Sequence, residues 1–343
     1  MPKTYNNLYP KIYDYDNLYN AFRAASRAKQ TRPEVLKYEW NLEENLINLQ
    51  NHLIYKSWNP HKYRHFTVYE PKRRDIDAPQ FEDRIIHHAL CQIIEPLFEK
   101  RFVESSFACR QGKGTHAAVL SAEKCIRSAA RIYRAPYIFK GDVSKYFYSI
   151  KHEVLKRQYR RTISCSDTLW LMDKITDCGG HDGVAVPIGA LTSQLYANIM
   201  LDPLDHYAKD KLGIRRYVRY MDDFIAIADN KDTAREYWWR LQNFVEFNLE
   251  LKLNPKSCIQ PLSKGLNFCG YRIWPGYRLP RKRNVRRMRK RLRKMVNLYK
   301  KQKCTSEAIC QSWQSFLGYM KHCKSHDTVV GIYEDLQKQL KEE

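Results

Sequence analysis

Two adjacent aspartates interrupt an otherwise apolar, strand-like run in the middle of this chain. The run covers residues 217–228, and the tetrapeptide Tyr-Met-Asp-Asp stands within it at 220–223. Neighbouring residues of a strand point to opposite faces of a sheet, so two consecutive carboxylates inside a strand would diverge. At the tip of a β-hairpin, however, Asp222 and Asp223 can lie close together, and carboxylates crowded in this way can hold divalent cations. A turn with two solvated aspartates is the alternative, since Asp is common in turns.

A third carboxylate stands at the end of another expected strand. Asp142 follows the apolar segment 137–139 and precedes a second apolar stretch. The three aspartates together could hold two Mg²⁺ ions, which is a common apparatus for in-line attack on phosphorus. One cation would activate an attacking hydroxyl, and the other would neutralise a triphosphate and its leaving pyrophosphate.

The composition predicts a folded protein with a polyanionic partner. The chain has 343 residues, a net charge of +23 and 43% hydrophobic residues, enough for a real core. None of the ten cysteines has zinc-knuckle spacing, so we expect reduced thiols in an intracellular protein. The sequence shows no secretory signal and no apolar run long enough to span a membrane, so we expect a cytoplasmic protein with no membrane partner.

Hydrophobic periodicity predicts a mixed α+β fold. Helices are expected over 15–29, 41–55, 81–100, 152–175, 191–204 and about 233–249. Strands are expected in a hairpin at 63–78 with a basic tip, at 137–139, on both sides of the Asp pair and at 267–273. This mixture of helices and mainly antiparallel strands lacks a βαβα rhythm, which favours α+β over a doubly wound sheet.

The segment 281–303 is intensely basic. It holds 13 Lys and Arg residues among 23 and no acidic residue. An apolar stripe runs through it at helical spacing, formed by Val285, Met288, Leu292, Met295, Val296 and Tyr299. A charge run is usually a solvated face, but one without any acid favours contact with a nucleic-acid backbone.

These motifs, in their order, resemble those of reverse transcriptases over nearly the whole chain. The matching stretches are 72–74, 107–116, 142–147, 187–194, 220–223, Lys256 and 268–271. The resemblance implies a right-hand polymerase with fingers, palm and thumb. It implies N-terminal helices and a fingers hairpin at 1–83, a palm at 84–274 with a fingers insertion at about 153–187, and a basic helical thumb at 275–343.

The resemblance also implies a role for each matching residue. The catalytic residues would be Asp142, Asp222, Asp223 and Lys256. The metal ligands would be Asp142, Val143, Asp222 and Asp223, with two Mg²⁺ ions for which Mn²⁺ can substitute. The deoxynucleotide-binding residues would be Lys72, Arg74, Val143, Phe147, Ile188, Gly189 and Gln194. The primer grip would be Cys269, Gly270 and Tyr271, and the nucleic-acid contacts of the thumb would be Arg281, Arg286, Arg287 and Lys290.

Three of these roles have alternatives that the sequence leaves open. Phe147 is either a steric gate that rejects a ribose 2′-hydroxyl or a core aromatic residue. Lys256 either protonates or neutralises the leaving pyrophosphate, or is a solvated lysine. Which side chains of the 72–74 stretch point toward the triphosphate depends on the strand phase, although cationic donors match phosphate oxygens well.

One departure narrows the family. Most reverse transcriptases have Gln and Pro where this chain has Ile188 and Gln194. The pattern is similar to the reverse transcriptases of diversity-generating retroelements, which copy a template-repeat RNA into cDNA mutated mainly at adenines. That resemblance implies template RNA, cDNA, deoxynucleotides and a small basic accessory protein that forms a barrel-shaped oligomer as partners, in a bacterial or phage-encoded system. Ile188 donates no hydrogen bond, and one lost polar contact corresponds to about 1 kcal/mol of discrimination. Alternatively, Ile188 packs under the nucleotide without any effect on fidelity.

Two other functions remain as alternatives. The first is an ordinary group II intron-like or other bacterial reverse transcriptase, although the short stretch after the primer grip leaves no expected room for a maturase domain. A retron enzyme would be expected to have the Pro of a Ser-Pro pair where this chain has Gln194, and an Ala in the catalytic tetrapeptide where this chain has Met221. The second is a catalytically inactive RNA-binding protein on a polymerase fold, whose signature would be a missing carboxylate; the chain has all three.

Overall fold

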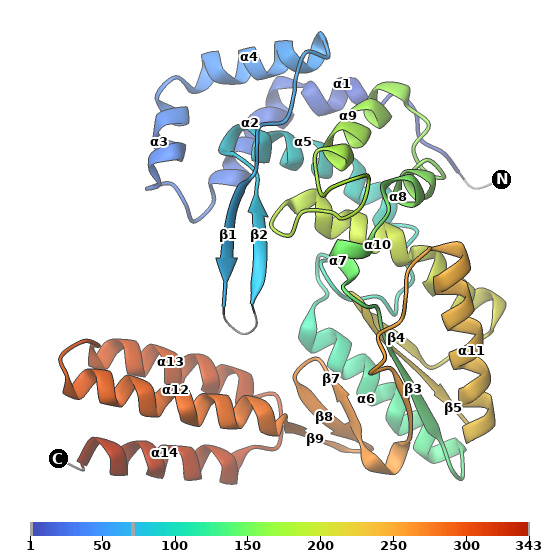
Figure 1. Ribbon diagram of the computed structural model, residues 1–343, viewed down its shortest axis with the longest axis vertical. Coiled ribbons are helices and arrows are strands. Elements are labelled where there is room, and N and C mark those ends of the chain that lie inside the picture. The colour runs from blue at the N-terminus through green and yellow to red at the C-terminus, as the bar shows by residue number, and fades with distance from the viewer. Residues whose placement is uncertain (1–2, 70–72, 342–343) are drawn as a thin grey trace. The chain divides into compact units, whose positions relative to one another are not determined.

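The computed structural model describes residues 3–69 and 73–341. These residues divide into two compact units that each draw on three stretches of the chain. Unit 1 comprises Met1–Arg110, Asp142–Gly213 and Trp239–Lys256, and unit 2 comprises Gln111–Gly141, Ile214–Trp238 and Ser257–Glu343. Figure 1 labels the helices and strands of both units.

Unit 1 is mainly helical. Its helices are α1 (Tyr9–Tyr13), α2 (Tyr15–Ser26), α3 (Pro33–Trp40), α4 (Leu42–Ile54), α5 (Phe81–Glu99), α7 (Tyr146–Ser149), α8 (His152–Tyr159), α9 (Ser166–Asp177), α10 (Leu191–His206) and the π-helix η1 (Tyr207–Lys211). Helix α5 is central because α1, α2 and α10 all pack against it. Its apolar residues Ile85, Ala89 and Ile94 are fully buried, so an apolar helix face drives this packing.

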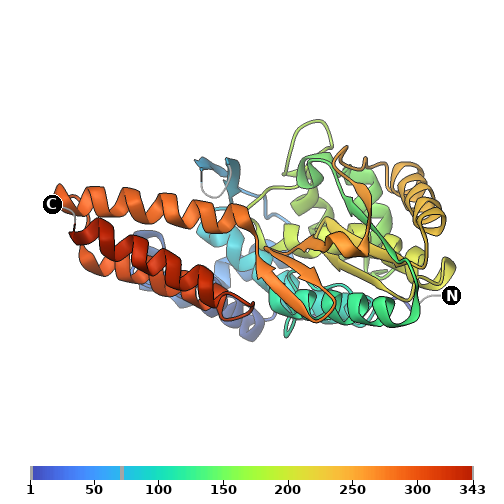
Figure 2. The same cartoon turned by 90° about the horizontal axis from the view of Figure 1, so that it is seen from below.

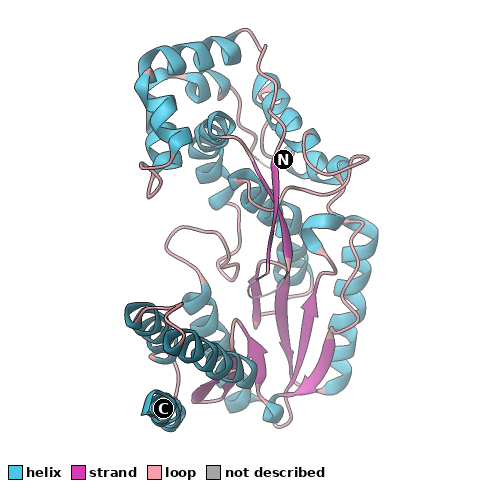
Figure 3. Ribbon diagram, turned by 60° about the vertical axis from the view of Figure 1, so that its left-hand side comes forward, coloured by secondary structure: helices cyan, strands magenta, loops and turns pink. Residues whose placement is uncertain are grey.

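A two-stranded hairpin extends from the helices of unit 1. Strands β1 (Arg64–Val68) and β2 (Arg74–Ala78) pair antiparallel, with Phe66 opposite Ile76. The two strands form a two-stranded sheet, and strands are drawn in magenta in Figure 3. The predicted hairpin is therefore confirmed, while Lys72 lies outside the described residues.

Unit 2 contains the sheet that carries the Asp pair. Strands β4 (Tyr217–Tyr220), β5 (Asp223–Ala228), β3 (Tyr137–Asp142) and β6 (Cys258–Pro261) form it in the order β4-β5-β3-β6. Helix α6 (Thr115–Ile132) packs on β4 and β5. Every residue of β5 after Asp223 is buried, which explains its continuous apolar sequence. The last residue of β3 and the second half of α11 (Lys231–Asn248) fall in unit 1.

A second, smaller sheet of unit 2 leads into a helical bundle. Strands β7 (Leu266–Phe268), β8 (Tyr271–Trp274) and β9 (Tyr277–Pro280) follow the 3₁₀ turn η2 (Leu262–Lys264), and helices α12 (Lys282–Lys300), α13 (Ser306–Met320) and α14 (His326–Lys341) come next. The three helices stay side by side in Figures 1 and 2, and α12 contacts both others. Three helices that are consecutive in the sequence thus pack into one bundle.

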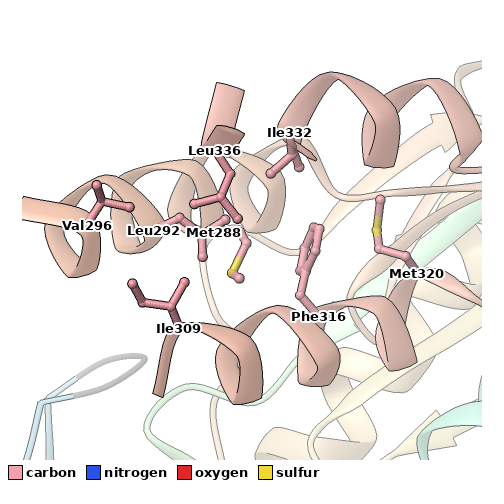
Figure 4. Packing of buried hydrophobic residues seen from close by; sticks show 8 residues of the cluster. All are labelled: Met288, Leu292, Val296, Ile309, Phe316, Met320, Ile332 and Leu336. Carbon is pink, nitrogen blue, oxygen red and sulfur yellow. The ribbon is translucent and has the colours of Figure 1, made fainter. Parts of the chain in front are cut away.

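The bundle core confirms most of the apolar stripe predicted for the basic segment. Met288, Leu292 and Val296 are buried there and face residues of the other two helices (Figure 4). Val285 and Met295 pack partly buried against this cluster. Tyr299, however, remains 43% exposed, so the prediction that it belongs to the packed face is wrong.

The paired strands confirm the α+β class, but two predicted elements were wrong in detail. The pairs β1–β2, β3–β6, β4–β5, β7–β8 and β8–β9 are all antiparallel. The predicted helix 152–175 is interrupted at 160–165, because the backbone of Thr162 and Ser164 bonds to Tyr5 instead, at 2.8 and 2.9 Å. The predicted strand 267–273 is a hairpin, because Cys269 and Gly270 adopt φ values of +43° and +90°.

Candidate active site

Asp222 and Asp223 lie at the tip of a tight hairpin, as the sequence predicted. Tyr220 pairs with Asp223, which leaves Met221 and Asp222 as the two turn residues. Met221 has a φ of +55°, the conformation that two-residue hairpin turns require at their first position. The guanidinium of the fully buried Arg219 donates a hydrogen bond to the Met221 carbonyl at 3.0 Å. A buried cation therefore holds this strained turn in place.

Asp223 has a cationic neighbour on the adjacent strand. The Lys140 ammonium lies 3.0 Å from Asp223 Oδ2 and donates a second hydrogen bond to the Asn267 carbonyl at 2.9 Å. Both side chains are only partly buried, so the ion pair contributes little stability. Its effect is positional, because it fixes the direction of one carboxylate oxygen.

Gly141 brings the end of β3 against the start of β5. A Cβ atom at this glycine would lie 2.3 Å from the ring of Phe224, a separation that no real side chain tolerates. Phe224 directly follows Asp223, and Asp142 directly follows Gly141. Glycine at 141 thus permits the close approach of the two strands that carry the aspartates.

Asp142 is oriented by a residue that the sequence analysis missed. The Asn254 side chain donates a hydrogen bond to Asp142 Oδ2 at 2.9 Å, and the Asn254 backbone N–H donates to the Asp142 carbonyl at 2.7 Å. Val143 is buried and bridges Leu253 on the same segment. The only available signal was the Asn-Pro step at 254–255, which is typical of a turn.

The side chain of Lys256 is exposed beside this turn. Its backbone N–H donates to the side-chain oxygen of Asn254 at 3.0 Å. The turn therefore links the predicted catalytic lysine to Asp142 through a single asparagine, while the ammonium remains able to reach a ligand.

The aspartates fit a divalent cation by their chemistry. Carboxylate oxygens are the ligands that Mg²⁺ prefers, and Asp142, Asp222 and Asp223 are all partly buried and thus open to ligands on one side. A cation at Asp223 would share that carboxylate with Lys140. Within residues 3–69 and 73–341, no group of three or more His, Cys, Asp or Glu side chains is arranged as a metal cluster.

Ile188 and Gly189 lie against the β1–β2 hairpin of unit 1. The Ile188 carbonyl accepts a hydrogen bond from the Asp77 backbone at 2.9 Å. Gly189 has a φ of +132°, and a Cβ there would lie 2.9 Å from Ile76 and 3.1 Å from the Asp77 carbonyl. This motif therefore fixes the base of the hairpin, and a larger residue at 189 would push the two segments apart.

The remaining predicted nucleotide residues of unit 1 occupy the starts of three elements. Gln194 is exposed in the first turn of α10, and Arg74 is exposed at the first position of β2. Phe147 is half-buried in α7, where its ring meets that of Tyr146 edge-on at 5.6 Å. Its partial exposure is compatible with either of the roles considered for it.

Cys269 and Gly270 form the turn between β7 and β8. The Gly270 carbonyl accepts hydrogen bonds from the Tyr319 hydroxyl at 2.5 Å and from the Arg281 backbone at 3.1 Å. The rings of Tyr271 and Tyr319 stack with centroids 4.8 Å apart. Burial, followed by the negative charge of Asp223, raises the pKa of the Cys269 thiol to about 12. Tyr319, which the sequence analysis also missed, therefore connects this turn to helix α13.

Helix α12 has a basic, solvent-exposed face. Its predicted contact residues are all exposed: Arg281, Arg286, Arg287 and Lys290. Arg289, on the same helix, pairs with Asp335 of α14. The exposed positions of α12 therefore carry a dense positive charge.

Comparisons with known proteins agree with this geometry. The model of the family "Reverse transcriptase (RNA-dependent DNA polymerase)" matches residues 69–273. The protein YkfC of Escherichia coli (strain K12) is 26% identical over 250 residues, which cover 60% of this chain and 65% of YkfC. The mitochondrial nuclear intron maturase 1 of Arabidopsis thaliana is 31% identical over 103 residues, covering 29% of this chain and 14% of the maturase.

Among solved structures, the chain is similar to an apo telomerase from Candida tropicalis truncated from its C-terminal domain. The TM-score is 0.49 at 14% identity, and the match covers 69% of this chain and 59% of the telomerase.

The family match covers more than half of the chain and includes Asp142 and the Asp pair. The chain therefore belongs to the reverse transcriptase family. It spans less than two thirds of the length of the curated relatives YkfC and the maturase. In the described part of the chain, no helix has both the length and the apolar character needed to cross a bilayer.

Proposed function

We propose that this protein is an RNA-directed DNA polymerase that extends a primer along an RNA template. The observation that carries the proposal is the Tyr220–Asp223 hairpin, whose turn is held by the buried Arg219 and whose Asp223 is held by Lys140. A turn in a costly conformation that carries adjacent carboxylates indicates function rather than stability. The family match over residues 69–273 supports the same activity.

The reaction forms a bond between the primer 3′-oxygen and the α-phosphorus of a deoxynucleotide and releases pyrophosphate. Asp142, Asp222 and Asp223, with the Val143 backbone, would hold two Mg²⁺ ions, or Mn²⁺ in their place. When bound, these cations supply charge neutralisation at the attacking and leaving oxygens. Asn254 orients Asp142 for this task through its 2.9 Å hydrogen bond.

The other residues would position the nucleotide and the primer. Lys72 and Arg74 would bind the triphosphate, and Lys256 would donate a proton to the leaving pyrophosphate or neutralise it. Phe147 would exclude the ribose 2′-hydroxyl, while Gly189 and Gln194 would border the templating base. The primer would rest on the Cys269–Tyr271 turn, which Tyr319 supports.

The same proposal divides the chain as a right hand. Fingers would comprise the N-terminal helices and hairpin at 1–83, the palm would comprise 84–274 with the insertion at about 153–187, and the thumb would comprise 275–343. Arg281, Arg286, Arg287 and Lys290 would contact the template–primer backbone. Their exposure supports this role, because backbone contacts come mainly from unburied Lys and Arg.

We further propose that the enzyme belongs to a diversity-generating retroelement. In that role it would copy a template-repeat RNA into cDNA mutated mainly at adenines, for mutagenic retrohoming, together with a small basic barrel-shaped accessory protein. Ile188 supports this subtype, because its half-buried apolar side chain can donate no hydrogen bond to a base pair.

The variant Ile188→Gln tests the subtype. Sequencing of the cDNA should reveal several-fold fewer errors opposite template adenines, since one polar contact is worth about 1 kcal/mol. Ile188→Leu is the matched control, because it keeps the side chain apolar and should keep the error rate. An unchanged adenine error rate in Ile188→Gln would refute the role of Ile188.

The competing function is that of an ordinary group II intron-like reverse transcriptase. The local similarity to an intron maturase favours it, at 31% identity over 103 residues. Accurate cDNA from the unmodified protein, with and without a candidate accessory protein, would support this alternative over the mutagenic subtype.

A further inference from the structure

Unit 1 contains a basic pocket that none of the predicted active-site residues lines. Its volume is about 540 Å³, within the range of about 300–1,000 Å³ that small-molecule sites occupy. Its walls come from the ends of α5, α8 and α10, from the π-helix η1 and from the second half of α11. We call this cavity the α8–α11 pocket.

Cations from separate elements converge on this pocket. Arg101 follows α5, Arg157 and Arg161 come from α8 and the turn after it, and Lys211 ends η1. Arg157 and Arg161 are exposed, and Arg157 has only a loose ion pair with Glu250 at 3.7 Å. Two guanidinium groups one helical turn apart can grip an anionic oxygen in the geometry that phosphate favours.

The acidic residues of the pocket are already engaged by a histidine. His206 Nδ1 lies 2.7 Å from Asp210 Oδ2, whereas its Nε2 lies 3.5 Å from Asp202 Oδ1 and 3.1 Å from the Arg101 carbonyl. Burial alone would lower the pKa of His206, but its acidic partners raise it overall. Asp210 is thus held by His206, and Asp202 lies between His206 and Arg101, whose guanidinium is 3.8 Å away. The exposed Arg157 and Arg161 are therefore the cations offered to a ligand.

Flat aromatic surface lies beside these cations. The rings of Tyr207 and Phe244 are stacked with centroids 4.3 Å apart and planes 15° from parallel. Phe247, one turn further along α11, is 79% exposed although it is a large apolar side chain. Bases of single-stranded nucleic acids stack favourably on such surfaces, whatever their sequence.

The pocket also offers an unused hydrogen-bond acceptor. Gln158 lines the cavity and is only 6% exposed, and its Oε1 accepts no hydrogen bond from the part of the chain that the structure describes. The terminal torsion of a Gln amide is soft, so the oxygen can turn toward a donor in the cavity. A buried acceptor left without a donor destabilises the protein, and a bound N–H group would remove that cost.

The backbone of the pocket wall is itself unusual. Residues Tyr207–Lys211 form a π-helix in which the Leu212 N–H reaches the Tyr207 carbonyl at 3.0 Å. Such segments are rare and occur frequently at functional sites. Here the wider turn carries both the stacked Tyr207 and the cationic Lys211.

We propose that the α8–α11 pocket binds one unstacked nucleotide of a single-stranded RNA, separately from the catalytic aspartates. The base would stack at Tyr207, Phe244 and Phe247 and donate a hydrogen bond to Gln158, and the phosphate would bind Arg157 and Arg161. The combination of base-stacking surface, buried amide acceptor and cations favours RNA over an acidic peptide, which needs only the cations. This inference rests on the proposed function in one respect, the RNA partner.

Photocrosslinking of the full chain tests the pocket. A single-stranded RNA containing 4-thiouridine is irradiated with the protein in EDTA, and adducts are mapped by mass spectrometry. We expect adducts at Tyr207, Phe244 or Phe247, with a yield at least fivefold lower in Arg157→Gln/Arg161→Gln. Arg23→Gln/Arg27→Gln is the matched control, because it removes the same charge from two exposed residues, one in α2 and one directly after it.

Phe247→Ala is a second variant that leaves the arginines unchanged. Because Phe247 is exposed, this substitution should not unfold the protein. It should lower the pocket adduct at least threefold. Adducts confined to other parts of the chain, or equal yields in the arginine variant and its control, would overturn the inference.

The pocket and the polymerase can fail separately. Asp222→Asn should abolish cDNA synthesis and leave the pocket adduct unchanged, whereas Arg157→Gln/Arg161→Gln should still extend an unstructured primed template. A pocket adduct without any cDNA from the unmodified protein would refute the proposed function and keep the pocket.

Discussion

Replacing Asn254 by Ala tests whether orientation of Asp142 matters for catalysis. The substitution removes the 2.9 Å hydrogen bond to Asp142 Oδ2 and the 3.0 Å acceptor for the Lys256 backbone. A hydrogen bond to a charged group contributes about 1.5–3 kcal/mol, and Asn254 is half-buried, so we take the lower half of that range. If that energy orients the carboxylate in the transition state, the rate falls about tenfold for each 1.4 kcal/mol.

We therefore expect Asn254→Ala to lower the extension rate about tenfold or more, with the nucleotide KM changed by less than about threefold. The assay is single-turnover extension of a DNA primer on an unstructured RNA template at saturating Mg²⁺. Asn20→Ala, on the exposed face of α2, is the control and should keep the full rate. An unchanged rate in a folded Asn254→Ala protein would show that Asp142 needs no such support and would refute the reasoning.

Three further predictions concern stability. Tyr319→Phe should lower the free energy of unfolding by about 1 kcal/mol in a urea titration, because the Gly270 carbonyl loses its 2.5 Å hydrogen bond. The variant should also make shorter products in a single-encounter extension assay. An unchanged product length would argue against a link between this turn and α13. Phe316→Ala should lower the free energy of unfolding by about 3–5 kcal/mol, because the ring is buried in the bundle core. A decrease of less than about 1 kcal/mol in the same titration would contradict that packing. Burial, and after it the charge of His88, lowers the pKa of His87 from 6.5 to about 3. The contribution of neutral His87 to the free energy of unfolding should therefore be complete above pH 6.5 and be lost as the pH falls toward 3. His87→Gln should flatten this pH dependence, and an unchanged dependence would exclude His87 as its source.

The sequence was most informative where one local pattern decides the structure. The apolar flanks around Tyr220–Asp223 predicted a hairpin with carboxylates at its tip, and the structure has it. The stripe in the basic segment predicted which residues of α12 pack buried or partly buried in the bundle, with Tyr299 as the exception. Such patterns suffice because side-chain periodicity and turn geometry involve only near neighbours.

The sequence was least informative where distant segments meet. The break at 160–165 depends on backbone hydrogen bonds to Tyr5, and the partner of Asp142 is Asn254, 112 residues away. Lys140 and Tyr319 likewise gain their roles only from the positions of Asp223 and Gly270. An ordinary Asn, Lys or Tyr carries no local signal for these contacts.

The central claim is that the carboxylates of the hairpin catalyse cDNA synthesis on an RNA template. The most direct test is deep sequencing of the products made by the purified protein on a template-repeat RNA, with Asp222→Asn as the matched control and with or without a candidate accessory protein. We predict cDNA that requires Asp222 and is mutated mainly opposite template adenines. Equal amounts of cDNA from the protein and from Asp222→Asn would contradict the claim.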